Sequence, residues 1–331
     1  MRWWLFALFV TLVVAAAAVV AWRMYEAPLA MKAARVEVRV APGASARSIA
    51  HQLQRAGVTV NADAFVAAAR TSKATQSLRA GRYEFNRGMS IETVLDKLRR
   101  GDVLRERITI VEGWNFRDMR AALSAQQDLR ADSAKMTDAE ILRAIGATET
   151  HPEGLFAPDT YVYDPGSSDL EVFHQAYRAQ ATALQQEWER RDGDVPYDSA
   201  YEALIMASIV EKETGQHGER RRIAGVFANR LKRRMLLQTD PSVIYGIGEK
   251  FDGNLRKRDL ETDSPYNTYT RAGLPPTPIA LPGRAAIAAA LNPEPTRALF
   301  FVARGDGTSY FSETLAEHNR AVNKYQLGGR Q

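Results

Sequence analysis

The stretch Ala207-Ser208-Ile209-Val210-Glu211-Lys212-Glu213-Thr214 ends an apolar run that begins after Pro196. The run is apolar almost all round, which predicts a helix that is buried on most faces. A glutamate at the end of such a helix loses hydration, and this loss disfavours its charged form. A carboxyl group that keeps its proton near neutral pH is suited to act as a general acid. A solvated helix end of mixed charge is the alternative that these eight residues leave open.

Helical geometry separates the two glutamates. At about 100° per residue, Glu211 and Glu213 project in nearly opposite directions, so we expect at most one of them to lie in a cleft. Glu211 shares a face with the small residues Ala207 and Ser208, which leaves room for a ligand beside it. Glu213 follows bulkier residues and is expected to cap packing or to meet solvent. We therefore predict that Glu211 is the catalytic acid and that Ser208 contacts the substrate.

Composition excludes several kinds of chemistry. The 331 residues include no cysteine, which rules out disulfides, thiolate nucleophiles and cysteine-ligated metals. The five histidines form no HExxH motif, and the chain has no P-loop, no Rossmann glycine motif and no GxSxG elbow. We therefore expect no metal, no cofactor and no nucleic-acid partner. The net charge of +5 is compatible with an acidic polymer or an anionic lipid surface, but ordinary soluble proteins carry as much.

The N-terminal segment contains no charged residue from Trp3 to Trp22, which is about the length that spans a bilayer as a helix. Tryptophans at both ends suit the two membrane interfaces. A cleaved signal peptide is the alternative, because residues 15–18 offer small-residue cleavage sites. An uncleaved anchor is favoured, since the apolar region is longer than a usual signal core. A short tail before the span predicts that the body of the protein lies outside the cytoplasm.

The periodicity of the remaining chain predicts an α+β protein. Residues 35–40 read as a strand, and a serine-capped helix follows them and ends at Gly57. The same pattern recurs from Gly81 to Gly101, which suggests a small paired module. A glycan-binding role and a spacer role for this module are equally compatible with the pattern. Further helices are expected over 137–145, 170–190, 219–234 and 285–291, with strands over 107–111 and 298–303.

Two later segments are rich in amides, hydroxyls and aromatics. They surround Asp240 and Asn267, and such a composition suits sugars, whose hydroxyls need hydrogen-bond partners and whose ring faces stack on aromatics. Turn formation at Asp240-Pro241 and Ser264-Pro265 is the alternative. By residue type, Asp240 is the best partner for Glu211, unless it caps the helix after Pro241.

Five motifs stand in order along the chain, and together they closely resemble the endolytic murein transglycosylase (MltG, YceG-like) family. They are Glu-Gly-Leu-Phe-Ala-Pro-Asp-Thr-Tyr (153–161), Ala-Ser-Ile-Val-Glu-Lys-Glu-Thr (207–214), Leu-Gln-Thr-Asp-Pro-Ser-Val-Ile-Tyr-Gly (237–246), Leu-Glu-Thr-Asp-Ser-Pro-Tyr-Asn-Thr-Tyr (260–269) and Gly-Leu-Pro-Pro-Thr-Pro-Ile (273–279). The first motif reads Leu155-Phe156 where tryptophans are common in the family. This departure puts a stacking role at that loop in doubt, but not the reaction.

The resemblance implies three parts: a cytoplasmic tip and transmembrane anchor over 1–24, a LysM-like module over 35–105 and a catalytic domain over 106–331. It implies a single-pass protein of the bacterial inner membrane whose catalytic domain lies in the periplasm. The implied activity is cleavage within peptidoglycan glycan strands, which would terminate the elongation of nascent strands. Synthases of the elongation or division machinery are the implied partners.

The family's catalytic glutamate is expected at Glu211, and the substrate-binding residues are expected at Ser208, Gln238, Asp240, Asn267, Thr268 and Tyr269. Because a lytic transglycosylase uses the C6 hydroxyl of N-acetylmuramic acid as its nucleophile, one carboxyl group can act first as acid and then as base. Intramolecular attack gives a 1,6-anhydro end. Two alternatives remain: a muramidase that activates water with Asp240 as base, and a glycan-binding scaffold in which Glu211 is inert.

Overall fold

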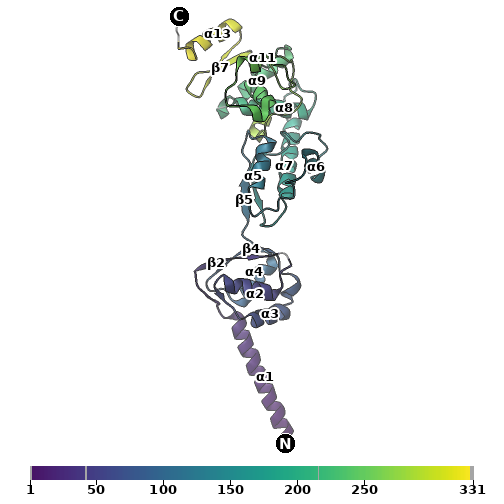
Figure 1. The fold of residues 1–331 in the computed structure, drawn as a ribbon, viewed down its shortest axis with the longest axis vertical. Coiled ribbons are helices and arrows are strands. Elements are labelled where there is room, and N and C mark those ends of the chain that lie inside the picture. Colours follow the sequence, from purple (N-terminus) through teal and green to yellow (C-terminus); the bar gives the residue numbers. More distant parts are fainter. Residues whose placement is uncertain (1, 42, 215, 329–331) are drawn as a thin grey trace. The chain divides into compact units, whose positions relative to one another are not determined.

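The protein, described here from a computed structural model covering residues 2–41, 43–214 and 216–328, divides into two compact units (Figure 1). The smaller unit comprises Met1–Glu106 and Val162–Ser167, and the larger unit comprises Arg107–Tyr161 and Ser168–Gln331. Helices alternate with short two-stranded sheets in both units, so the predicted α+β class is confirmed.

Helix α1 (Arg2–Glu26) contains the charge-free segment and is helical throughout its described length. Trp3, Trp4 and Trp22 on this helix are exposed. Within the described part of the chain, no helix meets the length and apolarity that crossing a bilayer requires. The transmembrane anchor therefore stays a prediction.

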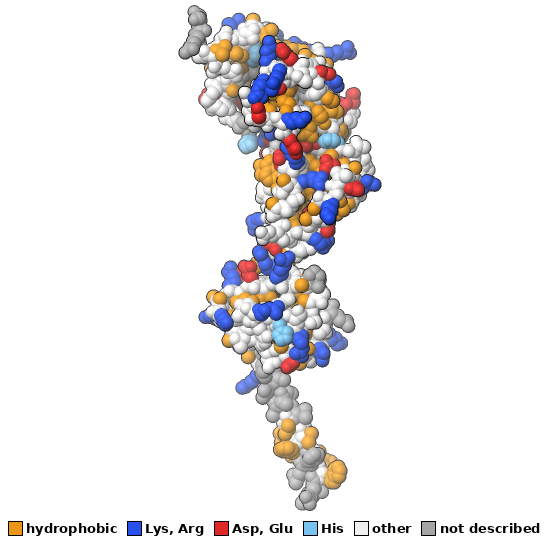
Figure 2. Space-filling model, viewed as in Figure 1, with side chains coloured by type: hydrophobic (Ala, Val, Ile, Leu, Met, Phe, Trp, Pro, Cys, Tyr) orange, Lys and Arg blue, Asp and Glu red, His pale blue; other side chains and the backbone are white. Residues whose placement is uncertain are grey.

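The smaller unit is built on an antiparallel pair of strands, β2 (Arg35–Val40) and β4 (Gly81–Asn86), in which Val38 lies opposite Tyr83. Alternation of apolar and polar residues turns one face of each strand inward. The buried side chains of the strands pack against three helices, and basic side chains are spread over the visible face of the unit (Figure 2). The other elements of this unit are β1 (Ala30–Met31), α2 (Ala46–Arg55), β3 (Val58–Thr59), α3 (Ala62–Thr71), η1 (Ala74–Gln76) and α4 (Ile91–Arg100).

The repeated pattern in the sequence corresponds to the two halves of this unit. The predicted serine caps are present, because Ser45 accepts the amide of Ser48 and Ser90 forms a capping box with Thr93. Helix α4 ends at Gly101 in the left-handed conformation, as its position in the sequence predicts. The LysM-like character of the unit stays a prediction.

The larger unit surrounds α8 (Ala200–Glu213), which packs against α7, α9, α10 and α12. Nine consecutive α8 residues, from Ala203 to Glu211, are buried, and each large aliphatic side chain among them contributes about 1.5–3 kcal/mol. Strands β5 (Glu106–Thr109) and β6 (Thr160–Tyr163) each have residues in both units. The other elements of the larger unit are α5 (Phe116–Ser124), α6 (Asp138–Ala144), α7 (Asp169–Glu189), η2 (His217–Glu219), α9 (Arg220–Lys232), α10 (Asp240–Ile247), η3 (Gly248–Lys250), α11 (Lys257–Glu261), α12 (Arg284–Leu291), β7 (Phe300–Ala303), β8 (Ser309–Ser312) and α13 (Leu315–Tyr325).

A close contact at Gly154 joins two of the five sequence motifs, 153–161 and 273–279. Gly154 has a φ of +81°, and a Cβ atom there would lie 2.5 Å from Cβ of Pro278. Only glycine accommodates both this backbone conformation and this close approach. The loop at 153–161 and the proline-rich loop at 273–279 therefore pack directly together.

Candidate active site

Helix α8 carries both candidate glutamates at its C-terminal end. Ser199 caps the start of the helix by accepting the amide of Glu202, and the chain leaves the helix at Thr214 in an extended conformation. As the helical geometry predicts, the carboxyl groups of Glu211 and Glu213 have entirely different partners.

Glu211 lies in a buried ion pair. Its Oε1 accepts a hydrogen bond from the Arg220 guanidinium at 2.9 Å, and its Oε2 accepts the backbone amide of Gly283 at 2.9 Å. The side chains of Glu211 and Arg220 are only 5% and 8% exposed. Arg220 also donates to Glu112 at 3.2 Å. Both carboxyl oxygens of Glu211 are thus held by protein donors, one a guanidinium and the other a backbone amide.

Glu213 has the environment that the sequence analysis assigned to Glu211. Its Oε1 accepts a hydrogen bond from the Thr239 hydroxyl at 2.5 Å, and no cation is paired with it among the described residues. Burial raises the pKa of the Glu213 carboxyl; the Thr239 hydrogen bond opposes this shift, and the charge of Asp240 adds to it. Glu213 was expected to cap packing or to meet solvent; it is half-buried and hydrogen-bonded to Thr239. The assignment of Glu211 as the acid stays a prediction.

Asp240 is an exposed carboxylate at the first turn of α10. Its Oδ1 accepts a hydrogen bond from the Tyr269 hydroxyl at 2.5 Å. Gln238, two residues before Asp240, is exposed and has a φ of +53°, an uncommon conformation for a residue other than glycine. Arg230 donates to the Gln238 side chain at 3.2 Å, and the Gln238 amide donates to the Thr268 carbonyl. Strained backbone of this kind often occurs at functional sites.

Three of the predicted substrate-binding side chains are buried and already hydrogen-bonded. Ser208 donates to the Ile205 carbonyl and accepts the amide of Ile279, so it joins α8 to the proline-rich loop. The Thr268 hydroxyl accepts the amide of Thr239 at 3.0 Å. These hydrogen bonds hold the backbone in place, whereas Gln238, Asp240 and Tyr269 keep accessible surface.

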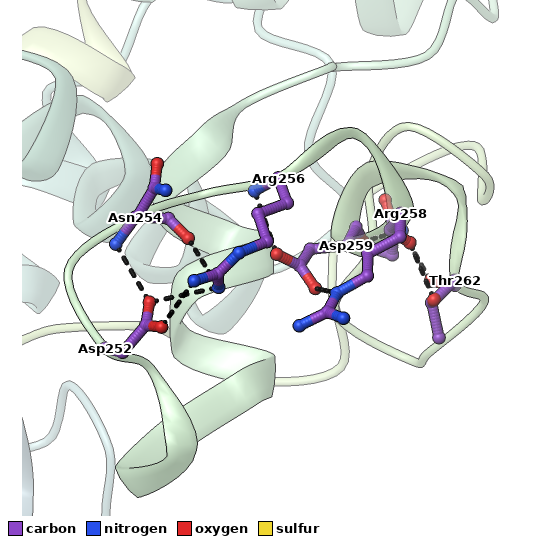
Figure 3. A network of polar contacts seen from close by, with 7 residues as sticks. Asp252, Asn254, Arg256, Arg258, Asp259 and Thr262 are labelled. Atoms are coloured by element: carbon purple, nitrogen blue, oxygen red, sulfur yellow. Dashed lines mark hydrogen bonds and ion pairs between the residues drawn. The ribbon is translucent and has the colours of Figure 1, made fainter.

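Asn267 is the third buried side chain, and it organises a loop. Its amide nitrogen donates to the carbonyls of Asp259, Leu260 and Thr262, and its oxygen accepts the amide of Tyr269. The loop that it holds has its own polar network, in which Arg256 pairs with Asp252 and its backbone amide donates to Asp259 (Figure 3). Asn267 thus fixes Tyr269 relative to α11.

Glu153 is a further perturbed carboxyl group to which sequence reasoning assigned no role. Its Oε1 accepts the amide of Phe116 and its Oε2 accepts the Tyr245 hydroxyl, both at 3.0 Å. Burial raises the pKa of Glu153 to about 7, against the opposing effect of these hydrogen bonds. A glutamate between Pro152 and a glycine in an apolar loop was the available signal.

A model of the YceG-like family matches residues 38–324. The chain belongs to the YceG-like family. A Bacillus subtilis (strain 168) protein named endolytic murein transglycosylase is 34% identical over 309 residues, and the match covers 88% of this chain and 84% of that protein. A Streptococcus pneumoniae (serotype 2, strain D39) protein of the same name is 28% identical, and there the match covers 58% of the relative's length.

A solved structure supports the same family. The 2.6 Å crystal structure of a putative yceG-like protein from Listeria monocytogenes matches with a TM-score of 0.57 and 32% sequence identity. The match covers 87% of this chain and 98% of that chain. The resemblance expected from the five motifs is therefore confirmed at the level of the family.

In this YceG-like chain, the structure gathers the predicted site residues into two groups. Gln238, Asp240 and Tyr269 lie with Thr239 in the cluster that contacts Glu213. Ser208 instead accepts the backbone amide of Ile279, and Glu211 accepts that of Gly283. Sequence reasoning missed Thr239 and Arg220, although Thr239 lies inside a recognised motif.

Proposed function

We propose that this chain is a lytic transglycosylase of peptidoglycan and that Glu213 is its general acid and base. The proposal is supported by membership of a family whose relatives are named endolytic murein transglycosylases. The observation that carries it is the raised pKa of a half-buried Glu213, hydrogen-bonded to Thr239 beside Asp240. A raised pKa favours the protonated form of the carboxyl group, which is the form that a general acid needs.

The reaction needs one carboxyl group and no water. Protonated Glu213 donates to the glycosidic oxygen as the bond from C1 of N-acetylmuramic acid to that oxygen breaks, and N-acetylglucosamine leaves with a hydroxyl. The Glu213 carboxylate then accepts the proton of the C6 hydroxyl while the C6 oxygen bonds to C1. The product carries a 1,6-anhydro ring and Glu213 is protonated again. Because the nucleophile belongs to the substrate, the reaction avoids the entropic cost of capturing a free water.

Asp240 is the candidate for stabilising positive charge at C1. Its carboxylate is exposed, and the Tyr269 hydroxyl orients it by donating a hydrogen bond to Oδ1. A negative charge held near the developing oxocarbenium ion lowers the energy of the transition state. A muramidase that uses Asp240 to activate water is the competing reaction, and it requires the same two carboxyl groups.

We propose that the enzyme is anchored in a membrane and cleaves bonds in the interior of glycan strands. We propose that residues 1–24 are a cytoplasmic tip and anchor of the inner membrane, on the basis of the charge-free segment from Trp3 to Trp22. Residues 35–105 are the LysM-like module and 106–331 the catalytic domain in the periplasm. Cleavage within nascent strands would end their elongation, with synthases of that machinery as partners.

The test compares two isosteric substitutions on purified peptidoglycan. Glu213→Gln is expected to abolish the release of 1,6-anhydro ends, whereas Glu211→Gln retains measurable release because it removes charge from an ion pair and not the acid. Mass spectrometry of the products also distinguishes the muramidase, whose ends are one water heavier. Full activity of Glu213→Gln would contradict the assignment, and loss of activity in Glu211→Gln alone would return the role of acid to Glu211.

A further inference from the structure

A cavity in the larger unit is lined by Glu153 together with residues of α5 and α10. It has a volume of about 510 Å³. The N-terminal half of α5 forms one wall, with Arg117, Arg120 and Ala121, and the C-terminal end of α10 forms the other, with Tyr245. His151, Pro152 and Glu153 line it from the loop that precedes β6.

Both walls of this cavity begin at the end of α8 that carries Glu213. On one side, the Lys212 side chain donates to the Gly113 carbonyl at 3.3 Å, three residues before α5 starts. On the other side, Thr239 contacts Glu213, and α10 runs from the next residue to Tyr245. At about 1.5 Å per residue, Tyr245 is roughly 7.5 Å along the helix from Asp240. The cavity therefore neighbours the proposed site of cleavage.

Charged side chains of both signs line the cavity. Arg117 forms an exposed ion pair with Glu249 at 3.0 Å, with the two side chains 54% and 79% exposed. Pairs as exposed as this are weak, so a carboxylate from a ligand can replace Glu249 at little cost. Arg120 pairs with Asp138 at 2.6 Å, which places a cation and an anion side by side. N-acetylated sugars carry no charge, whereas the peptides attached to muramic acid carry carboxylates.

The base of the cavity complements such a peptide. The buried apolar side chains of Phe116 and Pro152 are suited to the methyl groups of alanines. Tyr245 contributes an aromatic surface, and its hydroxyl is already hydrogen-bonded to Glu153. The lining therefore combines the exposed cation of Arg117 with the apolar surface of Phe116, Pro152 and Tyr245, a combination that suits a short acidic peptide with small side chains.

We propose that this cavity binds the peptide carried by N-acetylmuramic acid next to the cleaved bond, with Arg117 as the partner of a peptide carboxylate. The inference rests on the proposed transglycosylase function and gives its site a substrate preference. Strands that bear peptides are cleaved faster than the same strands after an amidase has removed the peptides.

The test measures kcat/KM of the full-length protein on the two substrates by counting 1,6-anhydro ends with mass spectrometry. The wild type is expected to prefer peptide-bearing strands by roughly tenfold, the size of one charge-assisted hydrogen bond. Arg117→Glu reverses the charge, and Ala121→Trp fills the cavity from an exposed helical position; each is expected to bring the ratio of the two rates close to one. An unchanged unfolding midpoint confirms that both variants fold.

Arg297→Glu is the matched control, because Arg297 forms an exposed pair with Glu313 at 3.2 Å and does not line the cavity. This variant keeps the wild-type preference. Equal rates of the wild type on both substrates would overturn the proposal. So would an equal loss on both substrates in Arg117→Glu, which would assign the cavity to the sugars. Absence of anhydro ends from either substrate would instead refute the proposed function.

Discussion

Replacing Glu153 by glutamine should change how the stability of the protein depends on pH. Glu153 is 3% exposed, with only neutral donors bonded to its oxygens. Burial raises its pKa from the usual 4.5 to about 7. Glutamine keeps the shape, accepts the Phe116 amide and presents an N–H toward Tyr245, so it reproduces the protonated acid.

The magnitude follows from the difference between the two pKa values. Below about pH 4.5 the carboxyl is protonated in both the folded and the unfolded chain. In that range it does not change the free energy of unfolding. As the pH rises through the unfolded and then the folded pKa, the unfolded chain releases its proton first, so the folded state loses stability. The shift from 4.5 to about 7 corresponds to roughly 3 kcal/mol.

We expect Glu153→Gln to match the wild type near pH 4 and to be more stable by about 3 kcal/mol near pH 8. Urea unfolding of both proteins at several pH values, followed by tryptophan fluorescence, measures this difference, and contributions from other groups cancel. Glu140→Gln is the control of opposite sign, because hydrogen bonds from Thr137 lower the pKa of Glu140. Its carboxylate stabilises the fold above the unfolded pKa, and that stability is lost as the pH falls. A difference between Glu153→Gln and wild type that stays constant across this range would refute the reasoning.

Further predictions concern the two glutamates of α8. Thr239→Val removes a hydrogen bond that lowers the pKa of Glu213, so the alkaline limb of the kcat/KM profile should move to higher pH. Asp240→Asn removes a charge that raises the pKa of Glu213, so the alkaline limb of its residual activity should move to lower pH. If both variants shift the limb in the same direction, Thr239 and Asp240 do not act on Glu213 in the opposite ways described. Arg220→Met leaves Glu211 buried without its cation and should lower the free energy of unfolding by about 3–5 kcal/mol in urea titrations, with partial recovery when Glu211→Leu is added. A loss under about 1 kcal/mol would show that the pair is not buried in solution.

Local sequence signals predicted most of the helices. Capping residues act within four positions of the helix they start, so Ser90 and Thr137 identified α4 and α6 from the sequence. The same signal was present but not used for α5, which the structure starts with a capping box between Asn115 and Asp118. The short α11 was also not predicted. At its start, the Asp259 carboxylate accepts the backbone amide of Arg256, which is an unusual residue for an N-cap position.

The candidate site was only partly predictable. The motif order placed Gln238, Asp240 and Tyr269 near one another, and the structure brings them together. The same motifs suggested Asn267 and Thr268 as ligands, but these side chains are buried and bind backbone groups. Amides and hydroxyls serve equally well to hold a loop or to hold a sugar, so residue type alone does not separate the two roles.

The sequence by itself determined the α+β class, the helix that ends in two glutamates, and membership of the YceG-like family. These depend on periodicity, on caps and on the order of motifs, all of which are properties of neighbouring residues. Only the tertiary structure decided which glutamate is paired with a cation. The amide that binds Glu211 comes from Gly283 and the hydroxyl that binds Glu213 comes from Thr239, which lie 72 and 26 positions away along the chain. The charge state of a carboxyl group depends on the groups that surround it in space, and no local pattern specifies those groups.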